Sequence, residues 1–208
     1  VVDSIAVLRV QPKHNKIRIF HSFDYEKTIV RTLDEWQKET AAVALINGAQ
    51  YMADPYYMPC ALVISDGKQK GPARNKNVRG MLLSEPKKSD VPSADLIDFD
   101  YEQFDPATTL YTQGLQHWPI LLDRQGSIKV KPSELRANRS VVAKTFDGDI
   151  LFFTTQRSSF TLYNFGAFLK ETNASVDGGF HVHTAMNLDG GKEANMILRS
   201  HDFTFDAK

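Results

Sequence analysis

The feature that most constrains the fold is a strand–turn–strand pattern in the second half of the chain. The runs RSVVAKTF (residues 139–146) and DILFFTT (residues 149–155) are rich in β-branched and aromatic residues, and Asp147-Gly148 separates them. Asp-Gly is a preferred hairpin turn because both of its positions accept positive φ angles. The pattern therefore predicts an antiparallel hairpin over residues 139–155.

Similar strand signals occur along most of the chain, together with two helix signals. Thr32 and Glu35 form a capping box that predicts a helix of about ten residues through Thr40, and from Thr161 onward apolar residues recur on one helical face. Strands are predicted at residues 5–10, 16–20, 42–47, 60–65, 81–85, 95–100, 118–123, 127–130, 180–188, 195–200 and 202–205. We expect an α+β fold, with a mixed, largely antiparallel β-sheet and two main helices packed on it, as a single domain over residues 1–208.

The remaining stretches are predicted as connections. Residues 48–59 contain three tyrosines and two prolines and indicate a long functional loop. The proline-rich, acidic stretch from Pro86 to Gln113 indicates an elaborated connection with one strand. Asp66-Gly67 is a turn signal between residues 60–65 and 81–85.

Composition excludes several classes of protein. The 208 residues include 25 basic and 25 acidic side chains, so the net charge gives no indication of binding to nucleic acid or to an anionic membrane. Cys60 is the only cysteine, which excludes an internal disulfide and a multi-cysteine zinc site. No apolar run approaches the ~20 residues of a membrane span. Because the chain starts at Val1, we expect a mature or trimmed form from which a signal or anchor segment is absent.

Two Asp-Gly-Gly triplets, at residues 177–179 and 189–191, flank His181 and His183. Paired glycines allow positive φ angles and close approach of the backbone to a ligand. Asp189 follows an apolar strand and can act as a nucleophile, a general acid or base, or a cation ligand, whereas the first triplet indicates a simple turn. The histidines alternate on a predicted strand and would share a face. Ordinary core or surface histidines are the favoured interpretation, and a metal-dependent phosphodiesterase using both histidines and Asp189 is an alternative.

Three further polar positions stand at predicted strand ends. Asn47-Gly48 indicates either a plain turn or an amide that binds a ligand. Gln116 precedes His117 and Trp118 and would combine an amide with a ring face on which a sugar can stack. Arg139 begins the strongest hairpin and is either solvated or a bidentate anchor for a phosphate or carboxylate.

Taken in this order, the segments resemble one family. They are residues 42–68, with a strand, Asn, an aromatic loop and Asp-Gly; 115–126, with Gln-x-x-Pro; 139–153, with Arg and the hairpin; 161–170, a helix; and 184–191, ending in Leu-Asp-Gly-Gly. The ordered set resembles the phosphodiester glycosidases, a family related to the enzyme that uncovers mannose 6-phosphate by removing N-acetylglucosamine, and most closely its bacterial branch. The resemblance covers roughly residues 40 to 200.

The resemblance implies an α+β fold, an extracytoplasmic setting and hydrolysis of a sugar-1-phosphodiester in a glycan. It implies site roles for Asn47, Gly48, Gln116, Arg139, Asn187, Asp189, Gly190 and Gly191. In the leading hypothesis Arg139 neutralises the phosphate, the amides orient sugar hydroxyls, and Asp189 attacks the anomeric carbon or assists water, with Glu193 as a second carboxylate. No cofactor is expected, and a divalent cation is left open. The expected partner is a carbohydrate phosphodiester or envelope polysaccharide, not nucleic acid.

The sequence departs from the family pattern at three places. Ala49-Gln50 follows Asn47-Gly48 where a second Gly or a Ser is frequent, and Ala143 stands where a Gly usually ends the strand. Lys192-Glu193-Ala194 follows the second triplet where a small residue and then a Ser is common. Loss of that serine hydroxyl motivates a second hypothesis, a non-catalytic domain that binds envelope polysaccharide.

Overall fold

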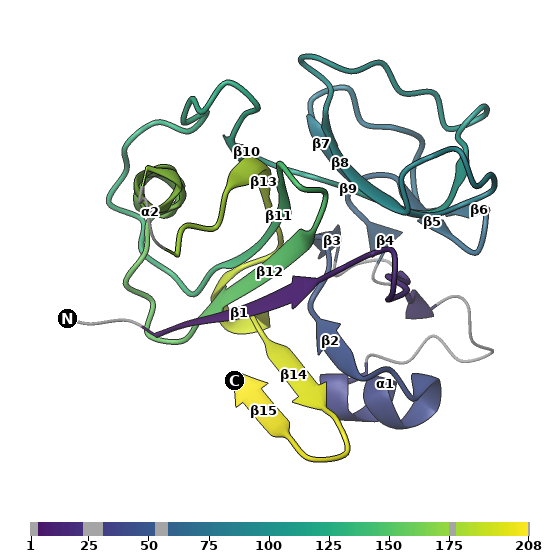
Figure 1. Ribbon diagram of the computed structural model, residues 1–208, viewed down its shortest axis with the longest axis horizontal. Coiled ribbons are helices and arrows are strands. Elements are labelled where there is room, and N and C mark those ends of the chain that lie inside the picture. Colours follow the sequence, from purple (N-terminus) through teal and green to yellow (C-terminus); the bar gives the residue numbers. More distant parts are fainter. Residues whose placement is uncertain (1–3, 23–30, 53–57, 175–177, 208) are drawn as a thin grey trace.

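The computed structural model describes residues 4–22, 31–52, 58–174 and 178–207 (Figure 1). These residues form two α-helices and four β-sheets. Every pairing between the labelled strands is antiparallel. The expected α+β class with two helices is confirmed in outline, although the described residues are mostly β-structure and the strands are divided among several sheets.

Sheet 1 contains the predicted hairpin and has the strand order β1-β12-β11-β13-β10. Its strands are β1 (Ile5–Val10), β10 (Ile120–Leu122), β11 (Ser140–Thr145), β12 (Ile150–Thr155) and β13 (Val182–Asn187). The turn between β11 and β12 lies at the predicted Asp147-Gly148, where Gly148 has a φ of 88°. The central strand β11 is completely buried except at Lys144.

Sheet 2 has the strand order β6-β5-β9-β7-β8. Its strands are β5 (Val63–Ser65), β6 (Lys68–Lys70), β7 (Gly80–Pro86), β8 (Ala94–Asp98) and β9 (Tyr111–His117). The prediction across Asp66-Gly67 is partly wrong, because β5 turns there into β6 rather than into β7. The central strand β9 is not predicted from the sequence, because its polar residues YTQGLQH resemble a connection.

Two smaller sheets complete the structure. Sheet 3 contains β2 (Ala44–Ile46), β14 (Met196–Arg199) and β15 (Thr204–Ala207), and sheet 4 pairs β3 (Tyr51–Met52) with β4 (Met58–Pro59). Helix α1 (Leu33–Thr40) packs beside β2 and β14. The predicted capping box is confirmed: the Thr32 hydroxyl accepts from the backbone N–H of Glu35, whose carboxylate accepts from the N–H of Thr32 at 2.7 Å.

The predicted strand at residues 16–20 is wrong. This segment is bound by side chains of sheet 2 instead of by a backbone ladder. The Ser84 hydroxyl donates to the carbonyl of Ile17, and the N–H of Ile19 donates to the side-chain oxygen of Gln113. Of the predicted loop 48–59, the structure describes β3 and β4 at its two ends, and residues 53–57 lie outside the described part.

Sheet 1 forms the middle layer of the molecule, and two hydrophobic clusters cover its faces. Helix α2 (Leu162–Asn173) packs on one face, and Figure 1 shows sheet 2 on the other side. The α2-side cluster includes Phe165, Leu169, Val141, Leu151 and Phe153. The cluster on the opposite face joins residues of sheets 1, 2 and 3, among them Val142, Met186, Leu82, Leu115 and Met196. Strands β11 and β13 are therefore packed against a hydrophobic cluster on each face of sheet 1.

Phe165 tests how strongly α2 stabilises this arrangement. Its ring is fully buried and makes edge contacts with the rings of Phe153 and Phe160. We expect Phe165→Ala to lower the free energy of unfolding by about 3–5 kcal/mol in urea titrations, because a cavity remains in the cluster. The matched control is Phe146→Ala. Because Phe146 is 66% exposed, this change should lower the free energy of unfolding by less than about 1 kcal/mol. An equal loss of unfolding free energy in the two variants would contradict the packing of α2 on sheet 1 through Phe165.

Candidate active site

Three of the predicted site residues meet where two neighbouring strands of sheet 1 begin and end. Asn47 follows β2, Arg139 precedes β11 and Asp189 follows β13. Because β11 and β13 are antiparallel, the start of one lies beside the end of the other. Their pairing continues past the strands: the N–H of Leu188 donates to the Ser140 carbonyl at 2.8 Å, and the N–H of Gly191 donates to the Asn138 carbonyl at 2.9 Å. Arg139 is thus placed opposite the Asp189-Gly190 step.

The Asn47 side chain joins the segments that meet there. Its amide nitrogen donates to the backbone carbonyl of Asp189 at 2.7 Å. Its oxygen accepts from the Ser140 hydroxyl at 2.6 Å and from the N–H of Asn195 at 3.1 Å. In addition, the N–H of Asp189 donates to the carbonyl of Gly48 at 3.0 Å. The Asn47 amide thus positions the loop that carries Asp189. Its role as a ligand for sugar hydroxyls stays a prediction.

Arg139 is a buried cation, exposed by only 6%, that the described residues do not neutralise. Its Nε donates to the carbonyl of Phe160 at 3.0 Å and its Nη2 to the carbonyl of Leu135 at 2.7 Å. Among the described residues no carboxylate forms an ion pair with it. Nη1 lies 3.8 Å from the position that a Cβ on Gly190 would occupy, so it faces the second triplet. Burial lowers the pKa of Arg139, but a guanidinium stays charged at neutral pH.

Asp189 lies beside a second carboxylate in this site. Its Oδ1 accepts from the N–H of Gly190 at 2.9 Å. Burial raises the pKa of Asp189, an effect opposed by the Gly190 N–H and by a hydrogen bond from the Gln50 side chain, whereas the charge of Glu193 raises it further. Glu193 accepts from the hydroxyl of Tyr51 at 3.3 Å. The sequence does not predict these interactions of Gln50 and Tyr51, although the place of both residues in the aromatic loop, shortly after Asn47-Gly48, is the signal that points to them.

Backbone geometry explains why both residues after Asp189 in the second triplet are glycines. A Cβ on Gly190 would lie 2.9 Å from the backbone oxygen of Asn138, and Gly191 has a φ of 68°. The predicted anion-binding role of their N–H groups needs correction. The N–H of Gly190 donates to Asp189 and that of Gly191 to Asn138, so both are already used.

Gln116 lies outside this cluster of contacts and is fully buried. Its oxygen accepts from the N–H groups of Leu62 and Asn75, at 3.1 and 3.0 Å. Its nitrogen donates to the carbonyls of Asn75 and Val78, at 2.7 and 2.8 Å. These four bonds use the full hydrogen-bonding capacity of the amide. Its predicted contact with substrate therefore needs correction to a role in shaping the segment from Leu62 to Val78.

Asn187 lies at the end of β13 and is 8% exposed. Its side-chain nitrogen donates to the carbonyl of Trp118 at 3.3 Å, and its side-chain oxygen is buried with no partner among the described residues. A buried acceptor without a donor is costly unless a ligand or water supplies one. Among the predicted substrate-binding amides, Asn187 therefore retains a free acceptor.

His117 packs beside Asn187 as a neutral side chain. Its Nδ1 lies 2.7 Å from the Asn187 carbonyl oxygen, and its ring stacks on that of Trp118 at 4.8 Å. Burial lowers the pKa of His117 to about 4. Being 1% exposed, the ring cannot offer a face to a sugar. Of the two rings suggested as a sugar-facing surface, only the partly exposed Trp118 remains.

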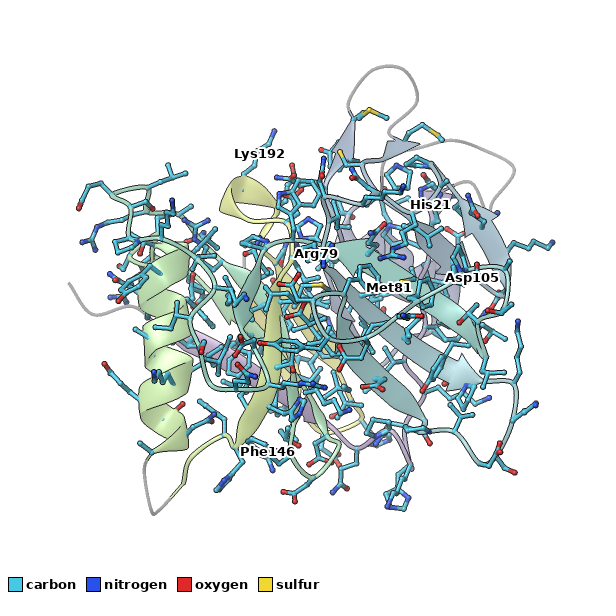
Figure 2. All side chains as sticks on the ribbon, turned by 90° about the horizontal axis from the view of Figure 1, so that it is seen from above. His21, Arg79, Met81, Asp105, Phe146 and Lys192 are labelled. Atoms are coloured by element: carbon cyan, nitrogen blue, oxygen red, sulfur yellow. The ribbon has the colours of Figure 1, made fainter. Side chains whose placement is uncertain are left out.

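The histidine pair lies at the opposite end of β13 from Asp189. The ring of His183 contacts Phe146 at 5.2 Å, and Figure 2 shows Phe146 and Lys192 at opposite ends of the molecule. At roughly 3.3 Å per residue, the six residues from His183 to Asp189 span about 20 Å. The predicted shared face is wrong, because His181 has a φ of 52° and precedes the strand. Within the described ranges no group of three or more His, Cys, Asp or Glu side chains could hold a metal ion.

The first triplet begins outside the described residues, at Asp177. Gly178 has a φ of 81°, as expected of a turn. A separate surface depression of about 430 Å³ is lined by Arg74, Phe99, Phe104 and neighbouring residues, and it includes none of the predicted site residues. Asn47, Arg139 and Asp189 are thus the predicted site residues that the structure brings together.

Comparison with known proteins assigns the family. The model of the phosphodiester glycosidase family matches residues 40–207. The chain belongs to the phosphodiester glycosidase family.

One solved structure with a similar fold is a Burkholderia pseudomallei protein described as a "Putative exported protein", with 10% sequence identity and a TM-score of 0.50. The alignment covers 93% of this chain and 66% of that one, just under two thirds of its length. No curated protein matches the sequence. In the described part of the chain, no helix has the length and apolar character needed to cross a membrane.

Gly190 gives a direct test of the close approach in this site. We expect Gly190→Ala to lower the free energy of unfolding by about 1–3 kcal/mol, because the new methyl group meets a backbone oxygen that cannot easily move. The control is Gly48→Ala, where the nearest atom to the added Cβ is a leucine methyl at 3.9 Å and the cost should be below about 1 kcal/mol. Urea denaturation of both variants measures the difference, and equal costs would contradict the tight docking at Asn138.

His117 gives a pH test. Its pKa is about 4 in the folded protein and near 6.5 when unfolded, so the unfolded chain binds more protons between these values and stability falls as the pH is lowered from 6.5 to 4. The full effect corresponds to about 3 kcal/mol. His117→Gln, which does not titrate, should show a shallower decline in urea titrations than the wild type. His201→Gln, at an exposed side chain, should keep the wild-type slope, and an unchanged slope in His117→Gln would refute the assignment.

Proposed function

We propose that the chain hydrolyses a sugar-1-phosphodiester, with Arg139 binding the phosphate and Asp189 acting at the anomeric carbon. The observation that carries this proposal is the buried guanidinium, which has no carboxylate partner among the described residues and faces the Asp189-Gly190 step. A buried cation without a counter-ion is costly, and a phosphate is an anion whose oxygens match the geometry of a guanidinium. The family match supports the same reaction class.

The chemistry follows from the two charges. The bond between the anomeric carbon and the phosphate oxygen breaks, and its electron pair leaves with the phosphate. Because Arg139 neutralises the charge that develops there, the leaving group needs little help from a general acid. Asp189 delivers the nucleophile, either as its own carboxylate oxygen or as a water from which it takes a proton. Retention or inversion at the anomeric carbon distinguishes the two routes, and Glu193 is the second carboxylate in either.

Recognition of the sugar is assigned to Asn187 and Trp118. The side-chain oxygen of Asn187 has no donor among the described residues. Because this atom is buried, a sugar hydroxyl supplies the missing donor only once the side chain rotates toward the site. The partly exposed ring of Trp118 offers an apolar face to the C–H groups of a pyranose. Asn47 supports the site through the backbone segments that it binds.

The setting and the cofactor requirement are part of the same proposal. The fold shared with a protein described as exported supports an extracytoplasmic enzyme that acts on a glycan phosphodiester. The proposed steps use only side chains of the chain itself, so activity should survive treatment with a chelator. Loss of activity on chelation, with recovery on adding a divalent cation, would overturn this part of the proposal.

Turnover of a panel of hexose 1-phosphate diesters tests the assignment. We expect Asp189→Asn to lower kcat by about 10²- to 10⁴-fold, because the nucleophile or base is lost. Arg139→Lys, which keeps the charge but not the forked geometry, should lower kcat by about 10²-fold or more. The controls Asp147→Asn and Arg9→Gln change an exposed turn and an exposed ion pair on β1 and should leave turnover unchanged.

Circular dichroism of each variant separates loss of activity from loss of fold. Full activity of Asp189→Asn would refute the assignment. Binding of the diesters by calorimetry, without turnover by the wild type, would instead favour the non-catalytic polysaccharide-binding domain. That second function is favoured by one observation: Lys192-Glu193-Ala194 follows the second triplet, where the family pattern commonly has a small residue and then a serine.

A further inference from the structure

The depression beside Arg74 and Phe99 includes none of the residues assigned to the proposed reaction. We propose that it is a second saccharide-binding site, which holds a neutral sugar unit of the glycan away from the scissile bond. Its volume of about 430 Å³ lies within the range of roughly 300–1,000 Å³ that small-molecule sites occupy. The choice of a glycan as ligand rests on the proposed function, whereas the site itself rests on the contacts of its own residues.

Arg74 places a cation in the depression that forms no ion pair with any described carboxylate. Its Nη1 donates to the carbonyl of Phe104 at 2.9 Å, and its guanidinium lies over the ring of Phe99, 4.2 Å from the ring centroid. These two contacts fix the position of the guanidinium. They use only one of its five N–H groups, so the terminal nitrogens keep donors for a ligand.

The loop between β8 and β9 forms the opposite wall of the depression and is internally braced. The N–H of Glu102 donates to the carbonyl of Asp98 at 2.9 Å, and the Glu102 carboxylate accepts from the N–H of Asp98 at 2.9 Å. Farther along the loop, the carboxylate of Asp105 accepts from the N–H of Ala107 at 2.9 Å. Because the wall is already ordered, a ligand that binds there loses little free energy to ordering the loop.

The polar lining combines a guanidinium, two carboxylates, an amide and a hydroxyl, contributed by Arg74, Glu102, Asp105, Gln103 and Thr108. A ligand with a large net charge of either sign would be repelled by part of this lining. Sugar hydroxyls both donate and accept hydrogen bonds, so they can bind groups of every kind present. The partly exposed ring of Phe104 adds an apolar surface for the C–H groups of a pyranose. The lining therefore suits a neutral saccharide.

Gln116 connects the depression with the proposed active site. Its side chain binds both the N–H and the carbonyl of Asn75, the residue after Arg74, and thereby fixes the backbone that carries the guanidinium. The next residue along β9 is His117, whose ring binds the carbonyl of Asn187 at 2.7 Å. One buried segment of the chain thus supports both sites.

The two sites are nevertheless separate on the molecule. Figure 2 shows Asp105, at the depression, well apart from Lys192, which follows the second triplet. A polymer can occupy both sites at once, which raises its affinity beyond that of either site alone. A short diester that fills one site gains nothing from the other.

Binding of phosphate-free oligosaccharides tests this proposal without turnover. In NMR titrations of the wild type with cellotetraose, maltotetraose and chitotetraose, at least one of the three should shift the backbone amide signals of Gln103 and Phe104. Gln103→Ala should raise the Kd of that oligosaccharide about 5-fold, the effect of losing one hydrogen bond. Gln69→Ala, which removes an exposed amide on β6, should keep the wild-type Kd.

Two results of these titrations would overturn the proposal. One is that none of the three oligosaccharides shifts the Gln103 and Phe104 signals, whether or not inorganic phosphate shifts them. The other is a wild-type Kd in Gln103→Ala.

The dependence on substrate length gives a kinetic test. KM is compared for a polymer of hexose 1-phosphate diester repeats and for a single diester. The ratio of the KM for the polymer to the KM for the single diester should rise about 5-fold in Gln103→Ala, because only the polymer spans both sites. An unchanged ratio would contradict a saccharide site that acts on the same glycan.

The Asp189→Asn variant separates this proposal from the proposed function. It should bind the oligosaccharide with the wild-type Kd, because position 189 lies outside the depression. Oligosaccharide binding at Gln103 and Phe104 supports the second site even if the wild type hydrolyses no diester. Hydrolysis of diesters without any oligosaccharide binding overturns the second site and leaves the proposed function standing.

Discussion

The site depends above all on the side chain of Asn47, because it joins segments that are distant in the sequence. One amide binds the carbonyl of Asp189, the hydroxyl of Ser140 and the N–H of Asn195. It thereby connects β2 of sheet 3 with β11 of sheet 1. It also binds the segments before and after a short 3-10 helix (Gly191–Glu193) that follows β13. No carboxylate or charged partner is involved, so the connection does not change with pH. An aspartate in this place would lack the donor for Asp189, and an alanine would lack all three bonds.

Given this junction, the chemistry of the site follows from charge and burial. Arg139 is buried among carbonyl groups, which leaves its positive charge uncompensated by the described residues. Asp189 lies across the same strand pairing, where Gly190 permits the loop to contact the Asn138 backbone. A cation and a carboxylate are thus held near each other without forming an ion pair. Such an arrangement suits a substrate whose phosphate binds one group and whose anomeric carbon meets the other.

Much of this site is visible in the sequence, but the roles of its residues are not. The strand-end positions of Asn47, Arg139 and Asp189 are predicted from apolar runs and turn residues, and the structure brings the three together. Gln116 is misassigned as a ligand because a polar residue beside a predicted strand has the same pattern whether it faces a substrate or a buried backbone. The strand β9 is hidden for the same reason, since Gln113 and Gln116 are buried by hydrogen bonds that only the tertiary structure supplies. The contact of Tyr51 with Glu193 depends on the register between two loops, which periodicity does not encode.

A crystal structure of Asp189→Asn with a bound hexose 1-phosphate diester would test the central claim most directly. The account predicts the phosphate within hydrogen-bonding distance of Arg139 Nη1 and the anomeric carbon beside the side chain at position 189. It also predicts a sugar hydroxyl that donates to the oxygen of Asn187. A diester bound elsewhere, for example in the depression beside Arg74 and Phe99, with Arg139 making only its two carbonyl contacts, would contradict the account.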